Sequence, residues 1–97
     1  MKAYFVVYEN VRDAQSLQTL AAEMRATMEP YQGRFLVRGG AFTTLEGEMP
    51  YQRIAVLEFP SRAAAESWYH SPEYQRLVPL RSQWAQYQVN LVDGVDS

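Results

Sequence analysis

Two segments of the chain, Ala3–Tyr8 and Arg53–Phe59, limit the possible folds most strongly, because each has the composition of a strand that is apolar on both faces. Aromatic and β-branched residues, which favour strands, make up most of the first segment. Alternate residues of a strand point to opposite faces, and both alternating sets are largely apolar: Ala3, Phe5 and Val7 against Tyr4, Val6 and Tyr8, then Ile54, Val56 and Glu58 against Ala55, Leu57 and Phe59. Such strands have to be covered on both sides. We therefore expect both segments at the centre of a sheet.

A helix is predicted directly after the first strand. Asp13 is a suitable N-cap for a helix that runs to about Met28, and Pro30 and Gly33 follow its end. One stripe of this segment is apolar at helical spacing: Leu17, Leu20, Ala21, Met24 and Met28. This stripe predicts that the helix packs its apolar side against the sheet.

Further helical segments are predicted in the second half of the chain. Ser61 follows a proline and can cap a helix over Arg62–Tyr69. Ser71-Pro72-Glu73 marks another helix start, because a hydroxyl cap, a proline at the first helical position and a carboxylate near the positive dipole end follow one another. Residues at helical spacing continue this segment, namely Tyr74, Leu77, Leu80, Arg81 and Trp84. Pro79 lies within it and is expected to kink or split the helix.

Two more strands complete the pattern. The segment Arg34–Leu45 is interrupted by Gly39-Gly40, and paired glycines in a strand usually mark a bulge or a close backbone approach. A turn-rich stretch at 46–50 predicts that this strand forms a hairpin with Arg53–Phe59. The last strand has one polar face, because Tyr87, Val89 and Leu91 alternate with Gln88 and Asn90.

The order strand, helix, strand, strand, helix, strand is that of the ferredoxin-like βαββαβ unit, an α+β fold with a four-stranded antiparallel sheet. In this topology the first and third strands are central, which agrees with their two apolar faces. The helices cover one face of the sheet. A bare apolar face of that size normally marks an interface, so we expect a second copy of the chain to cover the other face in a two-fold dimer.

Composition narrows the possible partners. A chain of 97 residues corresponds to about one domain, expected to span residues 1–97 with a frayed tail from Gly94 to Ser97. The net charge of −2 and the lack of a Lys/Arg block argue against nucleic acid. With no cysteine and one histidine, neither a Cys-ligated nor a multi-His metal site is expected, and no cofactor is predicted. The sequence shows neither a signal peptide nor a membrane-spanning apolar run, so we expect a cytoplasmic protein.

A series of short motifs extends over the chain from about Ala3 to Gly94. In order they are Arg34–Gly40, Leu45–Gly47, Glu58–Ser61, Trp68-Tyr69, Ser71–Gln75 and Arg81. Together they resemble DUF1330, a family of domains of unknown function in the dimeric α+β-barrel superfamily. The resemblance implies a ferredoxin-like subunit whose sheet pairs with that of a second copy, and it implies no particular activity. The wider superfamily includes cofactor-free monooxygenases, isomerases, haem-handling enzymes and stress-response proteins.

Arg38 and Glu58 form the first candidate site. Centring the hairpin near Met49 places these two residues opposite each other on neighbouring strands. One interpretation is a partly buried ion pair that stabilises the sheet. The alternative is an arginine fork that binds a carboxylate or phosphate of a ligand, with Glu58 orienting it.

Tyr69, Tyr74 and Arg81 form the second candidate site. All three are expected to point toward the sheet at one end of the subunit, where they would suit a small planar or anionic ligand. They would alternatively pack the seam between helices and sheet. His70, the only histidine, lies at a helix end and is interpreted as a surface residue.

Three functions agree with this pattern. The first is a homodimer that binds a small anionic or aromatic molecule between sheet and helices, through Arg38, Glu58, Tyr69, Tyr74 and Arg81. The second is a cofactor-independent enzyme, monooxygenase- or isomerase-like, in which an arginine binds the anion while Glu58 or Tyr69 moves a proton. The third is a structural or stress-associated dimer with a filled core. A cavity would favour the first two, and a bonded Arg38–Glu58 pair without a cavity would favour the third.

Overall fold

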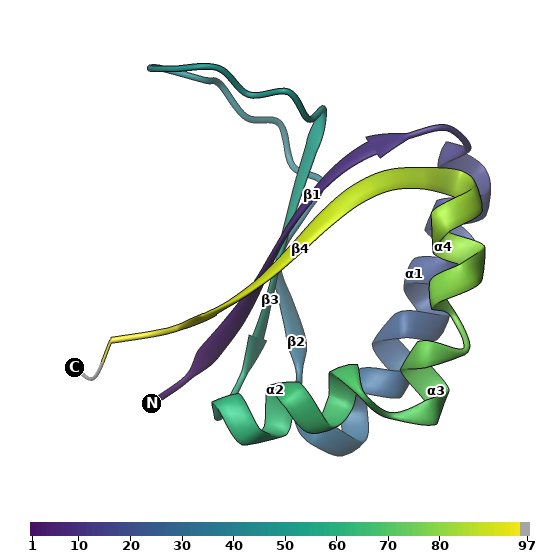
Figure 1. The fold of residues 1–97 in the computed structure, drawn as a ribbon, viewed down its shortest axis with the longest axis vertical. Coiled ribbons are helices and arrows are strands. Elements are labelled where there is room, and N and C mark those ends of the chain that lie inside the picture. Colours follow the sequence, from purple (N-terminus) through teal and green to yellow (C-terminus); the bar gives the residue numbers. More distant parts are fainter. Residues whose placement is uncertain (96–97) are drawn as a thin grey trace.

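The computed structural model describes residues 1–95, so the end of the expected C-terminal tail lies outside the described residues. Four antiparallel strands form one sheet, and the helices lie on one side of it (Figure 1). The elements in chain order are β1 (Ala3–Val11), α1 (Ala14–Met28), the 3₁₀ turn η1 (Glu29–Tyr31), β2 (Arg34–Arg38), β3 (Arg53–Phe59), α2 (Arg62–Tyr69), α3 (Pro72–Gln75), α4 (Val78–Trp84) and β4 (Ala85–Asp93). The fold is the expected α+β, ferredoxin-like one.

The strand order in the sheet is β2-β3-β1-β4, which confirms the prediction that the first and third strands are central. β1 pairs with β3 on one side, where Phe5 lies opposite Leu57, and with β4 on the other, where Phe5 lies opposite Leu91. The prediction that β4 has one polar face is also correct, since Gln86, Gln88 and Asn90 are exposed while the residues between them are partly buried.

The core lies between the helices and one face of the sheet. β1 contributes Ala3, Phe5 and Val7, whereas α1 contributes Leu17, Leu20, Met24 and Met28. Aromatic rings from three elements pack edge to face or at a tilt around Trp68, whose indole N–H donates to Thr27 Oγ1 at 3.0 Å. The helical stripe read from the sequence is therefore the stripe that is buried.

Side-chain caps begin the helices where the sequence predicts them. Asp13 accepts a hydrogen bond from Ser16 N, Ser61 from Ala64 N and Ser71 from Tyr74 N. The hydrogen bonds from Ser16 lower the pKa of the Asp13 carboxyl. The segment after Ser71 is split, as expected: α3 ends at Gln75, and Pro79 lies in the first turn of α4, where a missing N–H removes no helical hydrogen bond.

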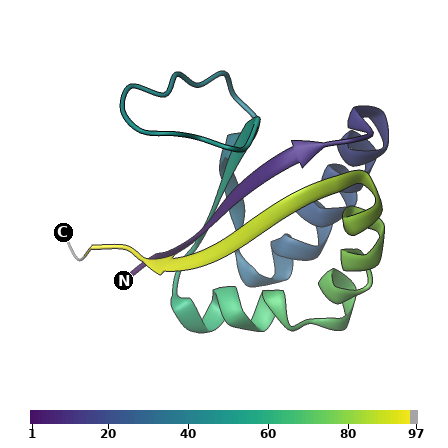
Figure 2. The same cartoon turned by 45° about the horizontal axis from the view of Figure 1, so that its top comes forward.

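β2 is shorter than the sequence predicted. It ends at Arg38 instead of continuing to Leu45, because Gly39 adopts a left-handed conformation with φ +69° that takes the chain out of the strand. The irregularity in the ladder lies between Phe35 and Val37 and not at the paired glycines. Residues 39–52 form an irregular loop that projects from the body of the subunit (Figure 2).

The second face of the sheet carries no helix from residues 1–95 (Figure 1). The apolar side chains that the two central strands place on this face are only partly covered: Tyr4, Val6, Tyr8, Ile54 and Val56. We call these five residues the outer face. The set that faces the helices is thus Ala3, Phe5, Val7 and Glu9, an assignment that the strand pattern alone left open.

Candidate functional site

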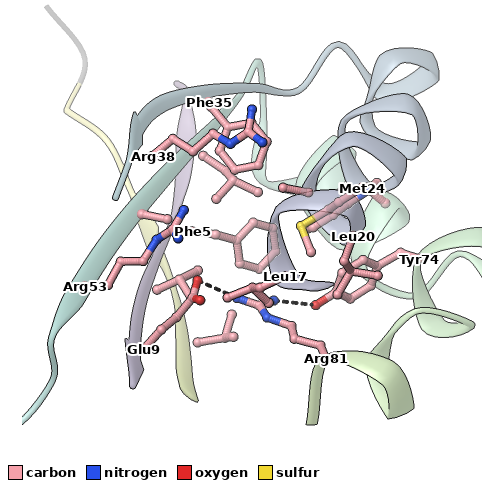
Figure 3. A pocket seen from close by; sticks show the side chains of 16 residues that line it. Phe5, Glu9, Leu17, Leu20, Met24, Phe35, Arg38, Arg53, Tyr74 and Arg81 are labelled. Carbon is pink, nitrogen blue, oxygen red and sulfur yellow. Dashed lines mark hydrogen bonds and ion pairs between the residues drawn. The ribbon is translucent and has the colours of Figure 1, made fainter. Parts of the chain in front are cut away.

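A cavity of about 40 Å³ lies between the sheet and α1 (Figure 3). Its walls are mostly apolar and include Phe5, Leu17, Leu20, Met24 and Leu57. Five lining residues bring polar chemistry: Glu9, Arg38, Arg53, Tyr74 and Arg81. The cavity therefore combines an apolar body with three guanidinium groups and one carboxylate.

Glu9 is a charged residue on the helix-facing side of β1. It continues the alternating set of Phe5 and Val7, and it is only 5% exposed. The first strand predicted from the sequence ended at Tyr8, so Glu9 was not among the predicted site residues. The signal that could have found it was the alternation itself, because a strand extended by one residue points Glu9 into the core.

Arg81 compensates the buried charge of Glu9. Its Nη2 lies 3.3 Å from Glu9 Oε1, and its Nη1 donates to the Tyr74 hydroxyl at 3.2 Å (Figure 3). The guanidinium also lies over the Tyr87 ring, 4.3 Å from its centroid. Burial raises the pKa of the Tyr74 phenol, an effect that the nearby Arg81 charge opposes. Arg81 is thus held on three sides and in turn holds the Glu9 carboxylate in place.

The network leaves two buried polar atoms of the site without a hydrogen-bond partner in the described chain, Glu9 Oε2 and Arg53 Nε. These residues are direct partners in the β1–β3 ladder, and both side chains line the same cavity. In Figure 3 the Arg53 guanidinium lies between Glu9 and Arg38. Two neighbouring lining residues therefore each carry one unsatisfied polar atom, an acceptor on Glu9 and a donor on Arg53.

Gly39 allows this placement of Arg53. A Cβ atom built on Gly39 would collide with the Arg53 guanidinium, so a side chain at this position would displace the guanidinium. The same residue donates its backbone N–H to Ile54 O at 2.9 Å. Of the paired glycines, Gly39 thus marks a close approach of the backbone to another group, one of the two possibilities predicted from the sequence, whereas a Cβ atom on Gly40 would meet nothing within 4 Å.

The predicted pair of Arg38 and Glu58 is wrong. Arg38 lies opposite Ala55, and Glu58 lies opposite Arg34, because the loop at 39–52 is not a symmetric turn around Met49. Glu58 is bonded on the side of the sheet away from the cavity, to Arg34 at 3.1 Å and to Lys2 at 3.3 Å. Arg38 itself lines the cavity and lies 5.3 Å from the Phe35 ring centroid.

The second predicted group is only partly brought together. Tyr74 and Arg81 are bonded and line the cavity described above. Tyr69 contacts the Tyr74 ring at 5.4 Å and stacks on Phe5 at 5.8 Å, but it lines a different cavity, beside His70 and β4. His70 is exposed at the end of α2, as interpreted from the sequence.

Over residues 1–95, no cluster of three or more His, Cys, Asp or Glu side chains is arranged to hold a metal ion. No helix within the same range is long and apolar enough to cross a membrane.

The fold and the cavity define a small ferredoxin-like α+β protein with a charged pocket between sheet and helices. The family model for the domain of unknown function DUF1330 matches residues 2–95, and the chain belongs to this family. No curated protein matches the chain significantly.

Solved structures show the same fold at low identity. The RPA0582 protein of unknown function from Rhodopseudomonas palustris superposes with a TM-score of 0.79 at 15% identity, over 99% of this chain and 84% of that one. A dimeric ferredoxin-like protein of unknown function from Jannaschia sp. CCS1 has a TM-score of 0.72 at 15% identity, over 97% and 100%. SnoaB, a cofactor-independent oxygenase from Streptomyces nogalater, has a TM-score of 0.64 at 14% identity, over 99% and 95%.

Proposed function

We propose that the protein binds a small organic anion in the cavity between the sheet and α1. The observation that carries this proposal is the charge of the cavity wall, where Arg38, Arg53 and Arg81 outnumber the single carboxylate of Glu9. Since Arg81 is already engaged by Glu9 and Tyr74, the two arginines on β2 and β3 are the groups that meet a ligand. Guanidinium groups bind carboxylates and phosphates with short, charge-assisted hydrogen bonds.

The size of the cavity limits the ligand. About 40 Å³ holds one or two water molecules, so only a few heavy atoms fit without movement of the walls. Arg38 is exposed, whereas Glu9, Tyr74 and Arg81 are buried. The mouth of the cavity is therefore at Arg38. A ligand enters there, places a polar group in the cavity and leaves any larger part at the mouth.

The structural alternative has less support. It called for a bonded Arg38–Glu58 pair and a filled core, whereas Glu58 pairs with Arg34 and the core contains a cavity with two polar atoms that lack partners among residues 1–95. A core built only for stability would satisfy those atoms or replace them with apolar groups.

The proposal includes a homodimer. The outer face is apolar and carries no covering element in the described part of the chain. A second copy packed against it would bury Val6, Ile54 and Val56 in a closed two-fold assembly. The similar protein from Jannaschia sp. CCS1 is described as dimeric, which supports this arrangement. A cytoplasmic location stays a prediction from the sequence.

A cofactor-independent enzyme is the second candidate, and one observation favours it. Glu9 lines the cavity next to Arg53, and one of its carboxylate oxygens has no hydrogen-bond partner among residues 1–95. The carboxylate can accept a proton from a ligand, and the Arg53 guanidinium can stabilise the anion that forms. Neither of the two proton-moving residues predicted from the sequence, Glu58 and Tyr69, lines this cavity, so Glu9 takes that role here. Proton NMR can follow an added acid in the presence of the protein. Conversion of the acid over time would favour the enzyme over simple binding.

Calorimetric titration with acetate, benzoate and isocaproate tests the anion-binding proposal. We expect at least one acid to bind and Arg38→Gln to weaken it about tenfold or more, the equivalent of one charge-assisted hydrogen bond. Arg34→Gln is the matched control, because Arg34 lies on the same strand, is exposed and faces Glu58 instead of the cavity. Failure of all three acids to bind at millimolar concentration, or equal weakening by both variants, would contradict the proposal.

A further inference from the structure

The strongest unexplained feature of the cavity is its pair of polar atoms, Glu9 Oε2 and Arg53 Nε, which find no partner within the described residues. Glu9 is buried almost completely, with 7% of its side chain exposed. A buried polar atom that stays without a hydrogen bond destabilises the folded state, and more so when it is charged. Native structures tolerate such atoms where a water molecule or a ligand forms the missing hydrogen bond.

The two atoms have opposite hydrogen-bonding character, and their residues are neighbours in the sheet. Glu9 and Arg53 face each other across β1 and β3, with both side chains on the helix-covered side of the sheet. A carboxylate oxygen accepts a hydrogen bond, and the arginine Nε–H donates one. Only a group that both donates and accepts can satisfy the two atoms together, and a hydroxyl is the smallest organic group that does so.

The other residues that line the cavity indicate what else such a ligand contains. Arg38 lies diagonally from Arg53 on the neighbouring strand, because it is paired with Ala55, so a second cationic group lies beyond the Glu9–Arg53 pair. Phe5, Leu20 and Leu57 supply apolar surface next to these charges. A carboxylate directed to Arg38 and a hydroxyl between Glu9 and Arg53 would match these charged groups, and the apolar walls would contact the few carbon atoms that fit between them.

We infer that the ligand is a small hydroxy acid and that Glu9 and Arg53 recognise its hydroxyl group. This inference rests on the proposed anion binding and adds to it a residue, Glu9, that distinguishes a hydroxy acid from the corresponding simple acid. In the absence of the ligand a water molecule can take the same position. A hydroxyl reproduces the hydrogen bonds of that water, whereas a hydrogen atom in its place leaves Glu9 Oε2 and Arg53 Nε unsatisfied.

Two matched pairs of acids test the inference by calorimetric titration of the full chain. Each pair differs only by one hydroxyl: 2-hydroxyisocaproate against isocaproate, and 4-hydroxybenzoate against benzoate. The pairs place the hydroxyl near the carboxylate and far from it, respectively. We expect the hydroxy acid of at least one pair to bind about tenfold or more tightly than its partner, as expected for a hydrogen bond to a charged group.

Variants of the two recognising residues complete the test. Glu9→Gln keeps the shape of the side chain, and it should abolish the preference for the hydroxy acid. Arg53→Gln should reduce the same preference and serves as the second variant, because Arg53 is less buried and forms none of the bonds that hold Arg81. Arg34→Gln, outside the cavity, should leave it unchanged.

The outcomes separate this inference from the proposed function. Equal binding of both acids in each pair, or a preference that survives Glu9→Gln and Arg53→Gln, overturns the role of Glu9 and leaves anion binding intact. Failure of every acid to bind overturns both. A preference that disappears in the cavity variants and persists in Arg34→Gln supports the inference.

Discussion

Replacement of Arg81 by methionine tests the network that supports the pocket. Arg81 is 4% exposed, its guanidinium lies 3.3 Å from Glu9, and it donates to the Tyr74 hydroxyl at 3.2 Å. Methionine has a similar length and no charge, so the variant leaves the Glu9 carboxylate buried without its counter-ion. Removing one partner of a buried ion pair destabilises a protein by about 3–5 kcal/mol. Since small domains are stable by about 5–15 kcal/mol, this loss is a large fraction of the total.

Urea unfolding followed by tryptophan fluorescence measures this loss, at one protein concentration for every variant because association shifts apparent stability. Arg62→Met is the control. It removes exposed ion pairs to Asp93 at 2.9 Å and Glu66 at 3.2 Å, and we expect no measurable change, because solvent screens such pairs. An Arg81→Met midpoint that equals that of Arg62→Met would refute the reasoning.

The double variant Glu9→Leu/Arg81→Met keeps the test decisive if the single variant does not fold. It removes both charges, and replacing a buried ion pair by apolar side chains is often neutral or stabilising. We therefore expect the double variant to be more stable than Arg81→Met alone. Equal or lower stability of the double variant would show that the buried charge of Glu9 is not the source of the loss.

Two further predictions concern the sheet and the phenol. Val6→Asp on the outer face should convert the proposed dimer to a folded monomer, as measured by sedimentation. Leu57→Asp, at a core residue only 2% exposed, should instead abolish the circular dichroism of the folded state. A Val6→Asp protein that is still dimeric would exclude this face as the interface. Burial raises the folded-state pKa of Tyr74 above its usual value of 10.0, so the folded state holds the phenolic proton more tightly, and stability should fall as the pH rises above about 10. In Tyr74→Phe the free energy of unfolding should fall less steeply with pH in this range. An unchanged pH dependence would contradict the role given to the Tyr74 phenol.

The order and type of the elements were predictable from the sequence because they depend on nearby residues. The caps at Asp13, Ser61 and Ser71 bond residues three positions ahead, and the buried stripe of α1 repeats within its own length. The two apolar faces of β1 and β3 placed them at the centre of the sheet, which the strand order confirms. Each of these features is visible within a window of a few residues.

The candidate site was predictable only in part, because it depends on contacts between distant segments. Arg38, Tyr74 and Arg81 line the cavity, whereas Glu58 faces Arg34, since an irregular loop and the shift between Phe35 and Val37 set the register of β2 on β3. Glu9 was overlooked because the predicted strand ended one residue before it, and its pairing with Arg81, 72 residues away, is not visible in the sequence.

The sequence by itself determined the ferredoxin-like arrangement and the need to cover a sheet with two apolar faces, because alternation and helical spacing are local properties of the chain. Only the tertiary structure decided which face meets the helices and which charges share the cavity. The register between strands and the distance between charges arise when segments far apart in the sequence pack together. The unsatisfied pair of Glu9 and Arg53, on which the ligand assignment depends, exists only in that packed state.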